Sequence, residues 1–159
     1  MVQEAVGELA AEALFGESSR LYLQLYEEGI IDGSFGGGFE TIDGMALLIA
    51  SGDSDYPEKV RAAILEEAER IVRQGIDEQD FLRMKRSALG RRIRELDSFN
   101  STVFRLCAYH FSHYDYFDFP KVYAQVEVSQ ILEFLQKTVT AQRCSLTVIS
   151  PKEENHESQ

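Results

Sequence analysis

This 159-residue chain has few long apolar runs, few histidines and few cysteines. Each of these absences excludes a class of protein or a kind of site. The longest apolar run, Met45 to Ala50, is far shorter than the roughly 20 residues that a membrane-spanning helix needs. Three histidines, all late in the chain, support no Ser-His-Asp or Cys-His catalytic set. Cys107 and Cys144 have no metal-ligand spacing and lie in apolar surroundings, which predicts buried free thiols in a reducing cytosol. A disulfide between them is the less motivated alternative.

Basic residues are also few, with 16 Lys and Arg against 27 Asp and Glu and a formal net charge of −11. This excess repels phosphates, so it argues against a general nucleic-acid binder and against an anionic membrane surface. The start, "MVQEAVGELAAEALF", lacks a basic stretch and carries three glutamates, so it is not typical of a signal peptide. We therefore expect a cytoplasmic protein.

What the chain does contain is enough apolar sequence, 44% of its residues, for a core. Apolar periodicity and boundary signals predict helices over residues 2–15, 20–28, 57–74, 77–96, 99–111 and 128–139. Alternation and short apolar runs predict strands over residues 34–42, 45–52 and 143–150. The helices form a block between strands, which predicts an α+β fold with helices on one face of a mainly antiparallel sheet. We expect a single domain over residues 1–151 and a flexible polar tail over residues 152–159.

Several details of these elements can be predicted. Asp43-Gly44 indicates a two-residue hairpin turn, and Asp77 and Ser129 are expected to cap the helices that follow them. The predicted buried stripe of one helix is Val60, Ile64, Ala68 and Ile71, and the apolar positions of the next helix are Leu82, Leu89, Ile93 and Leu96. Residues 112–128 are expected to form an aromatic-rich connector.

The glycine-rich stretch "DGSFGGGFETIDGMALLIASGD", from Asp32 to Asp53, has two interpretations. A phosphate-binding loop follows a strand and leads into a helix whose N-terminus points at the anion. Here the glycines follow a predicted helix and lead into a strand, and neither common phosphate-loop motif is present. Glycine in a strand is typical of a bulge or of the close approach of another backbone, so an extended peptide could be admitted there.

Two other groups are candidates for a site. His110 and His113, followed by Asp115 and Asp118, have a spacing that could pair them on one helical face to bind a metal ion. The alternative is two solvated histidines at the edge of an aromatic core.

The second group is basic and lies within "RMKRSALGRRIRE": Arg83, Lys85, Arg86, Arg91, Arg92 and Arg94. It could receive an acidic partner or a peptide carboxylate. The alternative is a solvated helix face opposite Glu66, Glu67 and Glu69.

The stretch "ALFGESSRLYLQLYEEGIIDGSFGGGFE" resembles the C-terminal, non-catalytic half of the pitrilysin, insulinase and mitochondrial processing peptidase family of zinc metallopeptidases. That half carries "S-R-L-[YF]-x-x-L-R-E-K-x-G-L-x-Y" before a hairpin, and Ser19 to Tyr22 and Leu25 match it. "SGDSDYPEKVRAAILEEAERIVRQGIDEQDFLRMKRSALG" is similar to the strand and two helices that follow. The "ELDSF" break and "RCSLTVISP" fall where that family has a helix break and a closing strand. The bacterial two-lobed subgroup is the most similar.

The resemblance implies a domain that forms one wall of a chamber enclosing an unfolded peptide. Catalysis and zinc are expected in an N-terminal domain of the parent protein, because the inverted zinc motif H-x-x-E-H is absent from this chain. No cofactor is expected here, and the chain alone is expected to be inactive. Its expected partners are that peptidase domain or a paralogous subunit, with a peptide substrate bound through the parent.

The chain departs from the family pattern at two positions. Tyr26 stands where the family has an arginine, and the family tyrosine falls near Asp32. In relatives this pair helps to hold the substrate backbone, so its loss favours the alternative of a non-enzymatic module that binds a partner chain. The candidate contact residues for substrate or partner are Arg20, Tyr22, Tyr26, Asp32, Gly36, Gly37 and Gly38.

The resemblance also implies strands ahead of the first predicted helix. Without them the sheet would have an unpaired edge and bare apolar surface, and such edges tend to pair with another chain. We therefore expect a partial domain that forms a two-fold homodimer through that surface.

Overall fold

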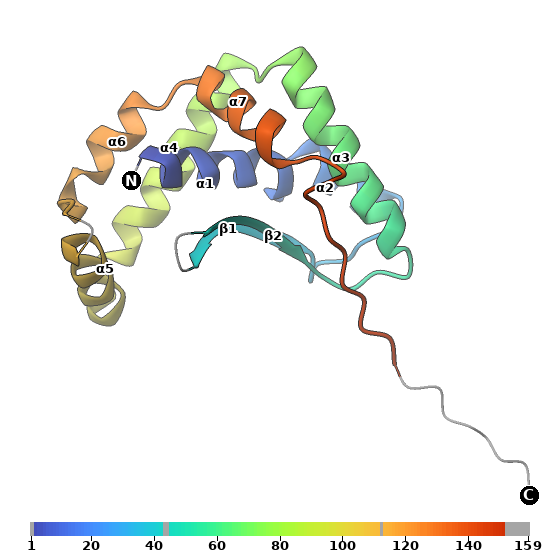
Figure 1. Cartoon of the computed structure of the whole chain (residues 1–159), viewed down its shortest axis with the longest axis horizontal. Helices are drawn as coiled ribbons and strands as arrows, with labels where there is room; N and C mark the ends of the chain where they lie inside the picture. The colour runs from blue at the N-terminus through green and yellow to red at the C-terminus, as the bar shows by residue number, and fades with distance from the viewer. Residues whose placement is uncertain (1, 43–44, 112, 152–159) are drawn as a thin grey trace, which may run out of the picture.

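The computed structural model describes residues 2–42, 45–111 and 113–151. In chain order the elements are α1 (Val2–Phe15), α2 (Arg20–Glu27), β1 (Gly36–Ile42), β2 (Met45–Ser51), α3 (Pro57–Gln74), α4 (Glu78–Glu95), α5 (Phe99–Phe111), the 3-10 turn η1 (Tyr116–Asp118), α6 (Phe119–Gln125) and α7 (Val128–Thr138). The helices arch over one side of a β-hairpin, with α1 directly against it (Figure 1). The predicted α+β class is confirmed.

The sheet consists of β1 and β2 in antiparallel pairing, with a register from Gly36 opposite Ser51 to Ile42 opposite Met45. The predicted hairpin is therefore confirmed, while its turn, Asp43-Gly44, lies outside the described residues. The prediction of a third strand over residues 143–150 is wrong, because residues 144–150 are extended without strand pairing. Their β-branched side chains favour an extended backbone, but a strand forms only where a neighbouring strand supplies hydrogen bonds.

Helix α1 is the centre of the core. Its buried residues are Ala5, Val6, Gly7, Leu9, Ala10, Ala11, Leu14 and Phe15. They occupy more than one face because α1 packs on β1 on one side and on α7 and α4 on the others. Leu9 and Leu14 are fully buried, as are Ile131 and Leu135 of α7. Each such side chain contributes about 1.5–3 kcal/mol by leaving water.

Polar caps fix where several helices begin. Ser19 caps α2, because its hydroxyl accepts a hydrogen bond from the Tyr22 amide at 3.1 Å. The predicted cap at Asp77 is confirmed, with its carboxylate accepting from Gln79. The predicted cap at Ser129 is wrong, because α7 begins earlier with a capping box between Glu127 and Gln130.

The apolar positions predicted for α4 are right in part. Leu89 and Leu96 are half-buried against the core, whereas Leu82 and Ile93 are exposed. The fully buried residues of the helix are Phe81, Met84, Ala88 and Arg92. The spacing i, i+3, i+7, i+11 is equally helical, but an arginine at its end hides the pattern in the sequence. By contrast, the α3 stripe is confirmed, with its residues buried or half-buried.

The expected connector contains a helix that the sequence pattern did not predict. Asp115 caps η1 by accepting a hydrogen bond from the Phe117 amide at 2.9 Å. Pro120 then stands in the first turn of α6, where its fixed φ suits a helix. Phe119 and Tyr123 are the buried residues of α6 and anchor it.

Two neighbouring glycines of β1 test how closely α1 approaches the sheet. A Cβ at Gly37 would lie 2.5 Å from the Phe15 ring and 2.8 Å from the Ile49 carbonyl oxygen, whereas a Cβ at Gly38 would meet nothing within 4 Å. We therefore expect Gly37→Ala to lower the free energy of unfolding by about 1–3 kcal/mol, and Gly38→Ala to leave it unchanged or slightly raised. Urea denaturation of both variants measures this, and equal values would contradict the close approach.

Candidate functional site

A groove of about 880 Å³ opens between β2, α3 and the extended C-terminal segment, residues 143–149. Its apolar lining includes Phe15, Ile31, Phe35, Leu48, Ala50, Val60, Ile64, Leu146 and Val148. Asp32, Asp53 and Asp55 line it where the loops leave the sheet. The outer edge of β2 pairs with no strand among the described residues. The groove can therefore offer both apolar contacts and free backbone groups to an extended polypeptide.

Two loops at one end of the groove are held together by serine hydroxyls. The Asp32 carboxylate accepts hydrogen bonds from the Ser34 amide at 2.7 Å and from its hydroxyl at 2.5 Å. The Ser34 hydroxyl in turn accepts from the Asp53 amide at 2.9 Å. Ser54 donates to the Ile30 carbonyl at 2.6 Å. The hydrogen bonds from Ser34 lower the pKa of Asp32, so this loop retains a carboxylate at neutral pH.

A row of aromatic rings leads from the groove to the surface of α2. Phe15 meets Phe35 edge-on at 6.4 Å between ring centroids, and Phe35 lies 6.3 Å from Tyr22. Tyr22 stacks on Tyr26 at 5.9 Å with an interplanar angle of 10°. Tyr26 is exposed, so the row ends in a ring that a ligand can contact.

The structure brings together some of the candidate contact residues. Asp32 lines the groove, and Tyr22 and Tyr26 reach it through Phe35. Gly36, Gly37 and Gly38 lie on β1, one strand away from the groove. Arg20 is exposed in the first turn of α2. The far wall of the groove, formed by residues 143–149, was not predicted, because the apolar residues of this segment are typical of a paired strand.

The outer face of the hairpin is open. A Cβ added at Gly36 or Gly38 would meet nothing within 4 Å, and Gly38 pairs with Ile49 in the sheet register. Leu47 and Ile49, which share that face by strand alternation, are exposed. This face therefore combines bare backbone with apolar side chains.

Helix α4 carries the basic residues, and the structure pairs several of them internally. Arg92 is buried, with 5% of its side chain exposed, and donates to the carboxylates of Glu4, at 2.9 Å, and Glu8. Arg91 pairs with Glu12 at 2.9 Å. The acidic partners thus lie on α1, and the prediction of Glu66, Glu67 and Glu69 as the opposing residues is wrong. Glu67 instead pairs with Arg70 of its own helix.

The buried charge has further partners. Tyr109 donates to Glu4 and Tyr123 donates to Glu8, so the cluster joins α1, α4, α5 and α6. Burial opposes the charge of Arg92, but Glu8 and the hydrogen bonds outweigh it and raise the Arg92 pKa. Burial also raises the pKa of Tyr109 and Tyr123, and their carboxylate partners add to it. The cluster is structural and leaves this arginine no access to a ligand.

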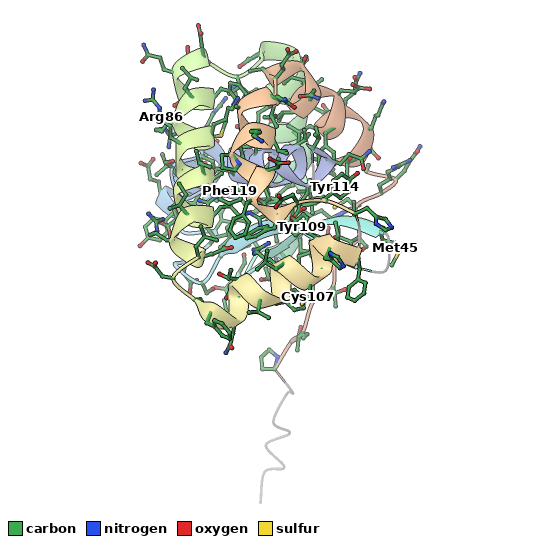
Figure 2. The ribbon with its side chains drawn as sticks, turned by 90° about the vertical axis from the view of Figure 1, so that its left-hand side faces the viewer. Met45, Arg86, Cys107, Tyr109, Tyr114 and Phe119 are labelled. Atoms are coloured by element: carbon green, nitrogen blue, oxygen red, sulfur yellow. The ribbon has the colours of Figure 1, made fainter. Side chains whose placement is uncertain are left out.

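The remaining basic residues divide between structural and solvated positions. Lys85 donates to the carbonyls of Ala124 and Val126, both at 2.9 Å, where α6 ends. Arg83 donates to Ser18 at 2.8 Å. Arg86 and Arg94 are exposed, and Arg86 points away from the molecule (Figure 2). Most of the basic group therefore contributes to the fold, and only its outer members offer charge to a partner.

The histidine pair does not share a helical face. Helix α5 ends at Phe111, and His113 lies beyond it with a φ of 59°. Asp115 accepts a hydrogen bond from the Phe117 amide, and Asp118 accepts one from Lys121. Within the described ranges, no group of three or more His, Cys, Asp or Glu side chains is arranged to hold a metal ion.

Both cysteines are free, but neither is buried: Cys107 is exposed and Cys144 is half-buried. The predicted burial is therefore wrong, because Cys107 lies on the outer side of α5 and Cys144 lines the groove. Across the part of the chain that is described, no helix is long and apolar enough to cross a bilayer.

Comparisons of the sequence and of the fold with known proteins lead to the same family of peptidases. Residues 2–88 match the family model described as the peptidase M16 inactive domain. A curated relative is the uncharacterized zinc protease YmfH of Bacillus subtilis (strain 168), which is 27% identical over 148 residues, covering 91% of this chain and 33% of the relative.

Two solved structures share the fold. A putative M16-like peptidase from Alicyclobacillus acidocaldarius superposes with a TM-score of 0.77 at 22% identity, over 86% of this chain and 33% of that one. A protease from Helicobacter pylori gives 0.70 at 15% identity, over 84% and 34%. The chain thus spans about a third of the length of each of these proteins.

The Arg92 cluster predicts a large effect of removing its positive charge. Arg92→Leu would leave the carboxylates of Glu4 and Glu8 together without a cation, so we expect the free energy of unfolding to fall by about 2–4 kcal/mol. The exposed Arg86→Leu on the same helix should change it by less than about 0.5 kcal/mol. Chemical denaturation at neutral pH compares the two, and a stable Arg92→Leu protein would contradict this account.

Asp32 predicts a local effect at the groove. Asp32→Ala removes the acceptor for Ser34, so we expect faster hydrogen exchange at the Ser34 and Asp53 amides, with Asp55→Ala as the control. Because the folded pKa of Asp32 is lowered, its stabilisation is present above the unfolded value of 3.8 and is lost as pH falls through the folded value. Equal exchange in both variants would show that the serine bridge does not hold the loops.

Proposed function

Because the chain belongs to the M16 peptidase family through its inactive domain, we propose that it is the C-terminal, non-catalytic domain of a pitrilysin-type zinc metallopeptidase. In this role it forms one wall of a chamber that encloses a peptide. The match over residues 2–88 supports this most directly. The chain covers a third of the relatives' length, which leaves room in a parent protein for a catalytic domain.

Zinc belongs, in this proposal, to that other domain. The donor sets of this chain do not fit a zinc site, since its described residues bring no three ligands together and zinc needs at least three protein ligands. The name of the curated relative, a zinc protease, supports a metal in the parent. The partner of this chain is then the N-terminal peptidase domain or a paralogous subunit.

The wall itself is best assigned to the outer face of the hairpin. Gly36 and Gly38 leave the backbone accessible, and Leu47 and Ile49 supply apolar contacts beside them. An extended peptide could lie on this face without steric conflict.

A second candidate is a non-enzymatic module that holds a partner chain. Tyr26 and Asp32, which replace the residues that grip the substrate backbone in relatives, favour it, and in the structure Asp32 is engaged by Ser34 and not by a neighbouring tyrosine. The upstream coding sequence discriminates the two. An H-x-x-E-H motif supports the peptidase domain, and a degenerate motif supports the binding module.

The test uses the isolated chain and the full-length parent. We expect the 159-residue chain to bind no stoichiometric zinc and to cleave no unfolded peptide, and the parent to do both. In the parent, Gly38→Val should lower kcat/KM for a peptide by about tenfold, or roughly 1.4 kcal/mol, with unchanged zinc content. Gly33→Val, in the loop ahead of the strand, is the control. One tightly bound zinc per isolated chain together with peptidase activity would overturn the proposal.

A further inference from the structure

Helix α5 (Phe99–Phe111) presents an apolar stripe to solvent. None of its residues is buried, which is unusual for a helix of this length, because helices in proteins derive most of their stability from tertiary packing. The half-buried Leu106 and Tyr109 face the rest of the molecule. The opposite side carries Val103, Phe104, Cys107 and Phe111.

The spacing of this stripe is that of a helix–helix contact. Residues 103, 104, 107 and 111 follow each other at i, i+1, i+4 and i+8, so they lie along one side of the helix. Phe104 is 75% exposed and Phe111 is 81% exposed. Figure 2 shows Cys107 on the side of α5 that faces away from the other helices.

We propose that this stripe, Val103, Phe104, Cys107 and Phe111, binds the same stripe of a second copy of the chain in an antiparallel, two-fold helix pair. With the two-fold axis near the middle of the helix, the large Phe104 of each copy faces the small Cys107 of its partner. The contact is self-complementary, as a two-fold interface requires. Antiparallel pairing also places the positive end of each helix near the negative end of the other.

Electrostatics allow this pairing although the chain has a net charge of −11. Helix α5 contains no acidic residue, and its one arginine, Arg105, pairs with Glu95 of α4 at 2.9 Å. The stripe itself is uncharged. Two copies can therefore approach along α5 without bringing like charges into the contact.

The area is near what a weak but specific dimer needs. A fully buried phenylalanine removes about 150–250 Å² from water, so two largely exposed rings from each copy supply about 450–800 Å². Val103 and Cys107 add the rest of the stripe and bring the total toward the roughly 1,000 Å² at the lower limit of a specific interface. We therefore infer a dimer that dissociates on dilution.

The sheet edge is a poorer site for a second copy. The outer edge of β2 lies in the groove behind residues 143–149, and two equivalent concave grooves cannot fill one another. Leu48, Val60 and Ile64, on the inner side of the groove, are already half-buried, whereas Leu146, Val148 and Ile149 of its far wall are exposed. The homodimer expected from the sequence is therefore relocated from the sheet edge to α5.

The test measures mass and proximity on the same 159-residue chain. Light scattering should show a monomer–dimer equilibrium at high micromolar concentration, and a short bis-maleimide should cross-link dimers through Cys107. Cys107→Ser should abolish the cross-link, and Cys144→Ser should keep it. Phe104→Glu should shift the protein to a monomer, whereas Leu23→Glu, at an exposed apolar site on α2, should not.

Circular dichroism establishes that Phe104→Glu remains folded, which is expected because its site contributes nothing to the buried core. A monomer at all concentrations would overturn the proposal, as would a dimer that survives Phe104→Glu. Cross-linking through Cys144 in place of Cys107 would put the second copy on the sheet edge and would also overturn it. None of these outcomes depends on zinc or on peptidase activity, so the dimer and the proposed function are tested independently.

Discussion

The fold depends on a reciprocal contact between α1 and β1, in which a glycine of each element accepts a phenylalanine of the other. Phe39 of β1 lies against Gly7 of α1, where a Cβ would be 2.4 Å from the ring. Phe15 of α1 lies against Gly37 of β1, where a Cβ would be 2.5 Å from the ring. Phe39 continues to Phe134 of α7, with ring centroids 6.0 Å apart. The helix can lie this close only because both positions lack a side chain.

This contact decides which surfaces remain available. It commits the inner face of the hairpin to α1, so the outer face, with Gly36, Gly38 and Ile49, is left open. It also sets the end of α1 beside the loops at Phe35, and those loops form one end of the groove. The open face and the groove are thus consequences of how the core is packed.

Local signals predicted much of the fold from the sequence. Pro57 and Gly75 mark the ends of α3, Asp77 caps α4, and the glycine-rich stretch forms a strand. These features depend on the chemistry of a few adjacent residues. The type of most helices and strands, and several of their ends, could therefore be predicted from apolar periodicity and capping residues.

The predictions that failed depend on contacts between distant residues. Residues 143–150 have the composition of a strand, but pairing requires a neighbour in space. The groove needs β2, α3 and those residues together, so only Asp32 and the aromatic residues near it could be proposed as part of the candidate site. Ser34 was overlooked because its role, bridging Asp32 to Asp53, joins two loops nineteen residues apart.

Two exceptions to amphipathic patterning remain, and they have opposite physical causes. Arg92 is inside because two carboxylates and two tyrosines surround it, so its charge is compensated within this chain. Phe104 and Phe111 are outside, and none of the described residues covers them. A buried charge that neighbouring carboxylates compensate adds to the core of a domain, whereas an uncovered apolar stripe leaves surface that a further contact would remove from water. The apolar stripe on α5 is therefore the surface of this domain at which contact with another chain would remove the most exposed aromatic area from water.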